Sequence, residues 1–139
     1  MNNQISKNYS SSGSIVISVY SAGGAIPVPD ALVTVRPSEK ENSGVISVLY
    51  TDMSGNTPKI TLPAPPETES EAPGNKKPYA TYNVEVDKAG FYPKRYINVP
   101  VFANTTSIQP VNLIPLTEYD GDLLPPKNQD VTEQQNTNL

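Results

Sequence analysis

Prolines and glycines divide this chain into segments too short for ordinary helices. The 139 residues include 15 prolines and eight glycines. Both disfavour helix interiors, because proline lacks the amide donor and glycine costs backbone entropy. The segments between them alternate apolar and polar residues with a period of two, and many of the apolar residues are β-branched. The sequence therefore predicts an all-β chain.

Seven segments with this alternation are predicted to be strands, separated by turns at the spacing of a β-sandwich. The clearest is 79–88, where Tyr82, Val84 and Val86 alternate with polar residues, and such positions are expected to face the core. The seven ranges are 14–22, 31–36, 45–51, 58–62, 79–88, 95–102 and 107–116. The inward residues predicted in the first six, beyond those three, are Ile15, Ile17, Val19, Ala31, Val33, Val35, Ile46, Val48, Tyr50, Ile60, Leu62, Ile97, Val99 and Val101.

The last predicted strand changes phase. Ile108 occupies an even position, whereas Val111 and Leu113 occupy odd ones. A slip of one residue reverses the two faces of a strand, so we predict a bulge or break near Pro110. Because proline removes a ladder donor, the same residue favours either that bulge or an edge position.

The flanks differ in composition from the middle of the chain. Residues 1–12 are predicted to be a flexible polar arm and residues 117–139 a disordered polar tail, around a domain of residues 13–116. The connection 63–78 is unusually long for a small domain and holds five prolines with Glu67, Glu69 and Glu71. Long connections of this kind are either functional or disordered, and the sequence leaves both readings open.

Composition excludes several function classes. The chain has no histidine, cysteine or tryptophan, which rules out histidine-dependent nucleophilic catalysis, histidine-bound zinc and disulfides. We therefore expect no enzyme activity, no cofactor and no metal. The net charge is −4 and the basic residues form no stripe beyond the pairs Lys76-Lys77 and Lys94-Arg95, so nucleic acid is not an expected partner. No apolar stretch has the length of a membrane span and no signal peptide begins the chain, which predicts synthesis in the cytoplasm without membrane insertion.

The segment from Asp52 to Asn56 allows two interpretations. Asp52, Ser54 and Asn56 stand at alternate positions, as calcium ligands do, but the closing glutamate of such a loop is missing. The favoured interpretation is a tight hairpin in which Asp52 binds its own turn and Gly55 adopts a positive φ.

Four motifs in order resemble the carboxypeptidase regulatory-like domain, a transthyretin-like family. They are GSIVISVY at 13–20, IPVPDALVTV at 26–35, YTDMSGNT at 50–57 and YNVEVDKAGFY at 82–92. The resemblance covers about residues 13–116 and implies a seven-stranded antiparallel Greek-key β-sandwich of the transthyretin or immunoglobulin type. It also implies that Tyr82 and Tyr92 are buried. All four are motifs of the fold rather than of catalysis.

Domains of this family act as appendages, which implies a structural or assembly module of a bacterial envelope, spore coat or phage-type particle. Such a module would contact other protein subunits, its own copies or different ones, through edge strands, the arm and the 63–78 loop. The alternatives are a carbohydrate- or peptidoglycan-binding module and an accessory subunit of a cell-wall hydrolase. The predicted contact residues are Tyr79, Tyr96, Glu67, Glu69 and Glu71, and Tyr50 is a further candidate if its ring does not face the core.

Overall fold

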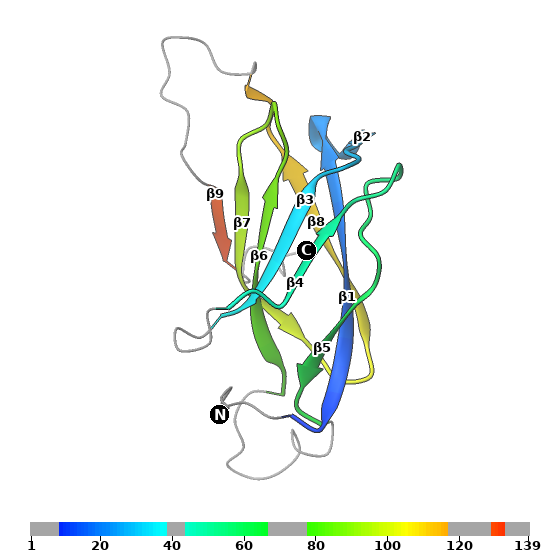
Figure 1. The fold of residues 1–139 in the computed structure, drawn as a ribbon, viewed down its shortest axis with the longest axis vertical. Helices are drawn as coiled ribbons and strands as arrows, with labels where there is room; N and C mark the ends of the chain where they lie inside the picture. The colour runs from blue at the N-terminus through cyan, green and yellow to red at the C-terminus, as the bar shows by residue number, and fades with distance from the viewer. Residues whose placement is uncertain (1–8, 39–43, 67–77, 117–128, 133–139) are drawn as a thin grey trace.

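The structure is a computed structural model that describes residues 9–38, 44–66, 78–116 and 129–132. Strands dominate it, and they form two sheets that lie against each other (Figure 1). The prediction of an all-β chain with two sheets is confirmed. Within the described ranges there are nine strands and one short 3-10 turn, Ala22–Gly24.

The first sheet is built around its longest strand, β1. β5 and β2 pair antiparallel with two different parts of β1 on one side, and β8 runs parallel to β1 on the other. The strands are β1 (Ser11–Ser21), β2 (Ile26–Pro27), β5 (Ile60–Ala64) and β8 (Thr106–Leu113).

The second sheet has the order β4-β3-β6-β7-β9. Its first four strands pair antiparallel, whereas β9 joins the outer side of β7 in parallel. The strands are β3 (Leu32–Pro37), β4 (Ser47–Tyr50), β6 (Ala80–Asp87), β7 (Lys94–Val101) and β9 (Gln129–Thr132).

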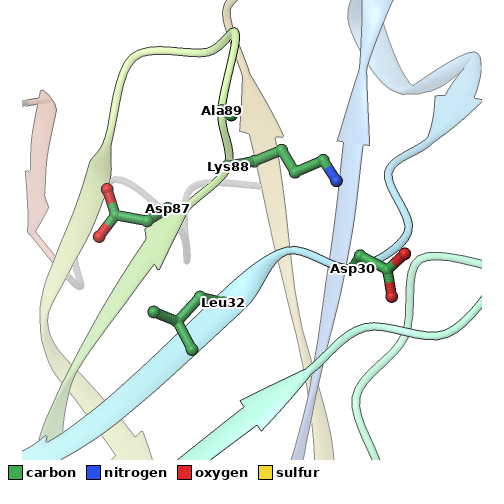
Figure 2. A pocket seen from close by; sticks show the side chains of 5 residues that line it. All are labelled: Asp30, Leu32, Asp87, Lys88 and Ala89. Carbon is green, nitrogen blue, oxygen red and sulfur yellow. The ribbon is translucent and has the colours of Figure 1, made fainter.

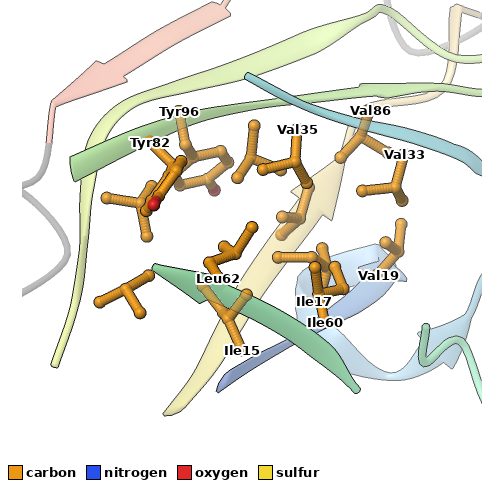
Figure 3. Close-up of a cluster of buried hydrophobic side chains, with 14 of the residues drawn as sticks. Ile15, Ile17, Val19, Val33, Val35, Ile60, Leu62, Tyr82, Val86 and Tyr96 are labelled. Carbon is orange, nitrogen blue, oxygen red and sulfur yellow. The ribbon is translucent and has the colours of Figure 1, made fainter. Parts of the chain in front are cut away.

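The hydrophobic core fills the space between the sheets, as Figure 3 shows. From the first sheet, Ile15 and Ile17 point inward, and Val33, Val35 and Val86 meet them from the second. Each is at most 2% exposed, and full burial of such a side chain contributes about 1.5–3 kcal/mol. The predicted inward faces of 14–22, 31–36, 58–62 and 79–88 are therefore confirmed.

The seven predicted strands correspond to β1 and β3 to β8, and two short strands were not predicted. β1 begins at Ser11, inside the segment predicted to be an arm, and Tyr9 packs against the core. β9 lies in the segment predicted to be a tail. Its four residues cover main-chain groups of β7 that would otherwise form an unpaired edge. Main-chain pairing of this kind requires no hydrophobic pattern, so the sequence carries little sign of it.

β7 contains a bulge that the alternation of the sequence did not predict. Tyr82 pairs with Val99 but Val84 pairs with Tyr96, so one residue of β6 lies opposite two of β7. Asn98 adopts a left-handed backbone with φ 62°, and its N–H donates to Asn83 Oδ1 at 3.0 Å. The bulge shifts the phase, so Tyr96 faces the core instead of Ile97.

The bulge predicted near Pro110 is wrong. β8 keeps continuous register with β1 from Thr106 to Leu113. Ile108 simply points outward and is 67% exposed, while the buried Gln109 donates from Nε2 to the Pro110 carbonyl at 2.9 Å. The alternative, that Pro110 lies on an edge strand, is confirmed because β8 pairs only with β1 within the described residues.

Candidate contact surface

β4 and the residue before it carry a row of exposed apolar side chains at the edge of the second sheet. Ile46, Val48 and Tyr50 are 42%, 56% and 60% exposed. The prediction that they face the core is wrong. Opposite residues of an antiparallel pair share a face, and the buried Val33 lies opposite Leu49. Leu49 therefore turns toward the core, and its neighbours in the row turn to solvent. We call Ile46, Val48 and Tyr50 the β4 row.

Thr51 fixes the register that exposes the β4 row. Its hydroxyl accepts a hydrogen bond from Ala31 N at 2.9 Å and donates one to the Val28 carbonyl at 2.6 Å. Its main-chain N–H also donates to the Ala31 carbonyl at 3.1 Å. Thr51 is 3% exposed, so these bonds are shielded from water. A buried threonine at the end of β4 thus decides which side of that strand faces the core.

The turn after Thr51 is tight and bound by Asp52, as predicted, but the prediction of a hairpin is wrong, because β4 and β5 belong to different sheets. Asp52 Oδ1 accepts hydrogen bonds from Ser54 N at 2.9 Å and Asn56 N at 3.0 Å. Gly55 has φ 85°, where L side chains are strained. The side-chain oxygen of Asn56 accepts a bond from the Ser18 hydroxyl at 2.6 Å. Two of the three side chains considered as calcium ligands therefore have structural roles: Asp52 holds the turn together and Asn56 attaches it to β1.

Charged side chains flank the β4 row on the same face. Glu85 lies between two arginines, with Arg36 Nη1 3.0 Å from one carboxylate oxygen and Arg95 Nη1 3.9 Å from the other. These side chains are a third or more exposed, so the pairs contribute little to stability. They give the outer face a polar region beside an apolar edge.

The free edge of β8 is interrupted by proline. Ser14 N donates to the Thr105 carbonyl at 2.8 Å, which turns the odd-numbered main-chain groups of β8 toward β1. The even-numbered groups consequently face away from the sheet. Pro110 is one of them and has no N–H to offer a further strand.

Lys94 and Tyr96, both on β7, lie beside Asn112 of β8. Lys94 Nζ donates to the Asn112 carbonyl at 2.8 Å and lies 5.7 Å from the centre of the Tyr96 ring. Burial raises the pKa of the Tyr96 phenol, against a smaller lowering by a main-chain hydrogen bond from Asn112. Burial lowers the pKa of Lys94. Tyr96 is 5% exposed, so this predicted contact residue lies inside the sandwich and presents no ring face to a partner.

The edge of β5 is interrupted in a similar way. The Ser12 carbonyl accepts from Asn104 N at 2.9 Å, so Ser12 faces β8, and its β5 partner Pro63 faces away from β1. Pro63 lacks an N–H, and its carbonyl accepts a hydrogen bond from the Tyr82 hydroxyl at 2.6 Å. Burial, with a smaller effect of Tyr9, raises the pKa of Tyr82.

The other predicted contact residues are not brought together with Tyr96. Tyr79 is half-buried and forms an edge-to-face pair with Phe102, with ring centres 5.2 Å apart. Glu67, Glu69 and Glu71 lie outside the residues that the structure describes. Tyr82 and Tyr92 are buried, as the resemblance implied.

A depression of about 430 Å³ lies beside the β4 row, at the start of β3 and the end of β6. Asp30, Leu32, Asp87, Lys88 and Ala89 line it, and Figure 2 shows the Asp87 and Lys88 side chains pointing to opposite sides. Over the described part of the chain, no three acidic side chains gather into a metal site. In those same ranges no helix is long and apolar enough to cross a membrane.

Comparison with known proteins identifies a fold and no family. No family model and no curated protein matches the chain. Among solved structures, catechol 1,2-dioxygenase from Acinetobacter sp. ADP1 matches 93% of this chain at 12% identity, with a TM-score of 0.53. The TIE protein of Bacillus anthracis matches 76% at 17% identity and TM-score 0.49, and 3-chlorocatechol 1,2-dioxygenase from Rhodococcus opacus 1CP matches 81% at 12% and 0.45. The chain spans 61%, 17% and 62% of these proteins respectively. At this identity the first likeness is one of fold alone.

Sequence reasoning found the residues of the β4 row but assigned them to the wrong face. The signal that could have corrected it is Thr51, since a buried threonine at a strand end needs partners for its hydroxyl. No comparable signal predicted that Tyr96 would bond the main chain of Asn112 at the outer side of β8. That contact depends on the bulge at Asn98, which turns Tyr96 inward, and on the parallel pairing of β8 with the distant β1.

Proposed function

We propose that this chain is a non-enzymatic structural module that joins protein assemblies through the exposed edge of its second sheet. The proposal includes the carboxypeptidase regulatory-like family with its Greek-key topology, and a setting in a bacterial envelope, spore coat or phage-type particle. One observation carries it: an apolar row 42–60% exposed runs along a short edge strand while the core beneath is complete. Exposed apolar edges of this kind favour association with another chain.

The test measures the size of the 139-residue chain over a wide range of concentrations. Light scattering would follow the mass, starting from 15.0 kDa for one chain, and negative-stain electron microscopy would examine the same samples. We expect the mean mass to rise with concentration, or defined particles to form. A mass of one chain at every concentration would contradict assembly from its own copies.

A carbohydrate-binding role is the second candidate, and the Tyr79–Phe102 pair supports it. Phe102 is 38% exposed and the two rings meet edge to face, so part of an aromatic surface remains open. Aromatic faces can pack on sugar rings. A pull-down on insoluble cell wall would compare Tyr79→Ala with Tyr50→Ala, which removes an exposed tyrosine from the other region. Equal retention of both variants would exclude the Tyr79 site.

A further inference from the structure

The edge strands of this sandwich differ in how they are protected. Native sheets discourage unwanted pairing with proline, charge or a covering segment. β5 has Pro63 with its carbonyl bound by Tyr82, β8 has Pro110 beside the bonded Asn112, and β7 is covered by β9. Among the residues that the structure describes, none of these devices protects the outer side of β4. Its residues, Ser47–Tyr50, include neither proline nor a charged side chain.

The main chain of β4 offers hydrogen-bonding groups on its outer side. Thr51 N donates to the Ala31 carbonyl, so Thr51 and, by alternation, Leu49 and Ser47 face β3. The N–H and C=O groups of Val48 and Tyr50 then point away from the sheet. These are the two residues of β4 whose side chains are most exposed.

We propose that β4 pairs antiparallel with β4 of a second copy of this chain, across a two-fold axis at Val48. The inference rests on the proposed function and names its partner. In this register Val48 lies opposite Val48 of the second copy, and Tyr50 lies opposite Ile46, the residue before β4. The Ile46 N–H already donates to the Val35 carbonyl at 2.8 Å, so in this outer pair the Tyr50 N–H and the Ile46 carbonyl form the main-chain hydrogen bond. Valine–valine and aromatic–β-branched pairs are favourable cross-strand combinations. The two second sheets become one continuous sheet, and the β4 rows form a single apolar stripe across the junction.

The absence of charge on this edge favours a second copy as the occupant. A two-fold axis at Val48 places that residue opposite its own counterpart, so a charged side chain there would face a like charge. Residues 44–51 contain no charged side chain. The β4 row can pair with a second copy of itself. The small, β-branched Val48 meets its counterpart at the axis, and the two ends of the row, Ile46 and Tyr50, meet each other. A different partner protein would have no need of this symmetry.

The first test is Val48→Lys, with Ile108→Lys as the matched control. Val48 and Ile108 are both exposed β-branched residues on edge strands, at 56% and 67%, and Ile108 lies on the closed edge of β8. Lysine at position 48 would face its own copy, so we expect the dimer dissociation constant to rise about tenfold or more. Ile108→Lys should dimerise as the unmodified protein does. Sedimentation gives the constants, and circular dichroism checks that both variants fold alike.

A second test depends on the lack of cysteine in the chain. Directly opposite residues of a hydrogen-bonded antiparallel pair have Cα atoms about 5.5 Å apart, within the range of a disulfide. Val48→Cys should therefore oxidise to a covalent dimer, whereas Ile108→Cys should remain monomeric under the same conditions. The formed bond joins two thiols with loss of two electrons and two protons to dissolved oxygen or diamide.

The outcomes separate this inference from the proposed function. Association of Val48→Lys with unchanged affinity would overturn pairing at β4 and leave an assembly role through another surface. Equal cross-linking of both cysteine variants, or none at position 48, would also overturn it. If the unmodified protein stays monomeric throughout, the assembly role from its own copies fails, and the β4 inference fails with it.

Discussion

The Tyr82 hydroxyl, on β6, donates a hydrogen bond of 2.6 Å to the Pro63 carbonyl on β5. This bond joins the two sheets at Pro63, which has no main-chain N–H to donate to a neighbouring strand. Tyr82 is 5% exposed, so removal of its hydroxyl would leave that carbonyl with a poor alternative partner.

Tyr82→Phe should therefore lower the free energy of unfolding by about 1–2 kcal/mol at neutral pH. The ring and its packing are preserved, so the loss reports the hydrogen bond. Urea unfolding followed by circular dichroism measures it. Tyr50→Phe, which alters an exposed phenol, should change the value by less than about 0.5 kcal/mol. Equal stability of the two variants would contradict a stabilising bond to Pro63.

Alkaline pH should destabilise the fold through Tyr82 and Tyr96. Burial raises the pKa of both phenols above the ordinary tyrosine pKa, which is about 10. The unfolded chain therefore loses these protons first. Their contribution to stability is complete below about pH 10 and is lost as the pH rises toward the folded-state pKa values.

Lys94 acts with the opposite sign. Burial lowers its pKa, so the folded chain loses this proton before the unfolded chain does. The free energy of unfolding therefore rises through Lys94 as the pH increases toward the ordinary lysine pKa. The comparison that isolates the tyrosines is the difference in unfolding free energy between the unmodified protein and Tyr82→Phe at pH 7 and pH 11. That difference should shrink at pH 11. A difference that is the same at both pH values would show that Tyr82 titrates normally in the folded state.

Gly13→Ala should be strongly destabilising. A Cβ on Gly13 would overlap the Phe102 carbonyl oxygen, and a Val101 side-chain methyl carbon would lie 2.9 Å from it. The obstacle is main chain of a neighbouring segment, so relief requires β1 to move. We expect a loss of about 2–3 kcal/mol, measured as the thermal and urea midpoints. Gly44→Ala is the control, since a Cβ there meets nothing within 4 Å.

The sequence predicts the inward face of a strand correctly only where hydrophobic alternation determines that face. β6 alternates strictly and β1 does so apart from Val16 and Tyr20, and both strands lie within their sheets, so the pattern alone identified their inward faces. In β4 both faces carry apolar residues, Leu49 on one and the row of Ile46, Val48 and Tyr50 on the other. Hydrophobicity alone could not choose between them, and the Thr51 hydrogen bonds did.

β7 and β8 illustrate limits of another kind. The bulge at Asn98 uses a left-handed non-glycine residue, whereas sequence signals for such positions rely on glycine. Gln109 is buried although polar, because its side chain bonds the adjacent Pro110 carbonyl. Tyr96 was therefore predicted as a contact residue although it is buried. The phase change at Ile108 was interpreted as a bulge, although β8 is continuous and Ile108 faces outward.

Thr51→Val tests whether the register of β4 is set by one hydroxyl. Valine keeps the shape but leaves Ala31 N–H and the Val28 carbonyl without their side-chain partner. Two buried groups lose a bond, so we expect a loss of about 2–4 kcal/mol. Thr57→Val removes only the acceptor for Ile17 N, at 3.0 Å, and should cost about half as much. Thr51→Ser, which retains the hydroxyl, should recover most of the loss. Amide hydrogen exchange would localise the effect, with protection lost first at Ala31 and along β4. If Thr51→Ser were as unstable as Thr51→Val, the lost methyl rather than the lost hydrogen bonds would explain the effect, and the β4 row would owe its exposure to packing.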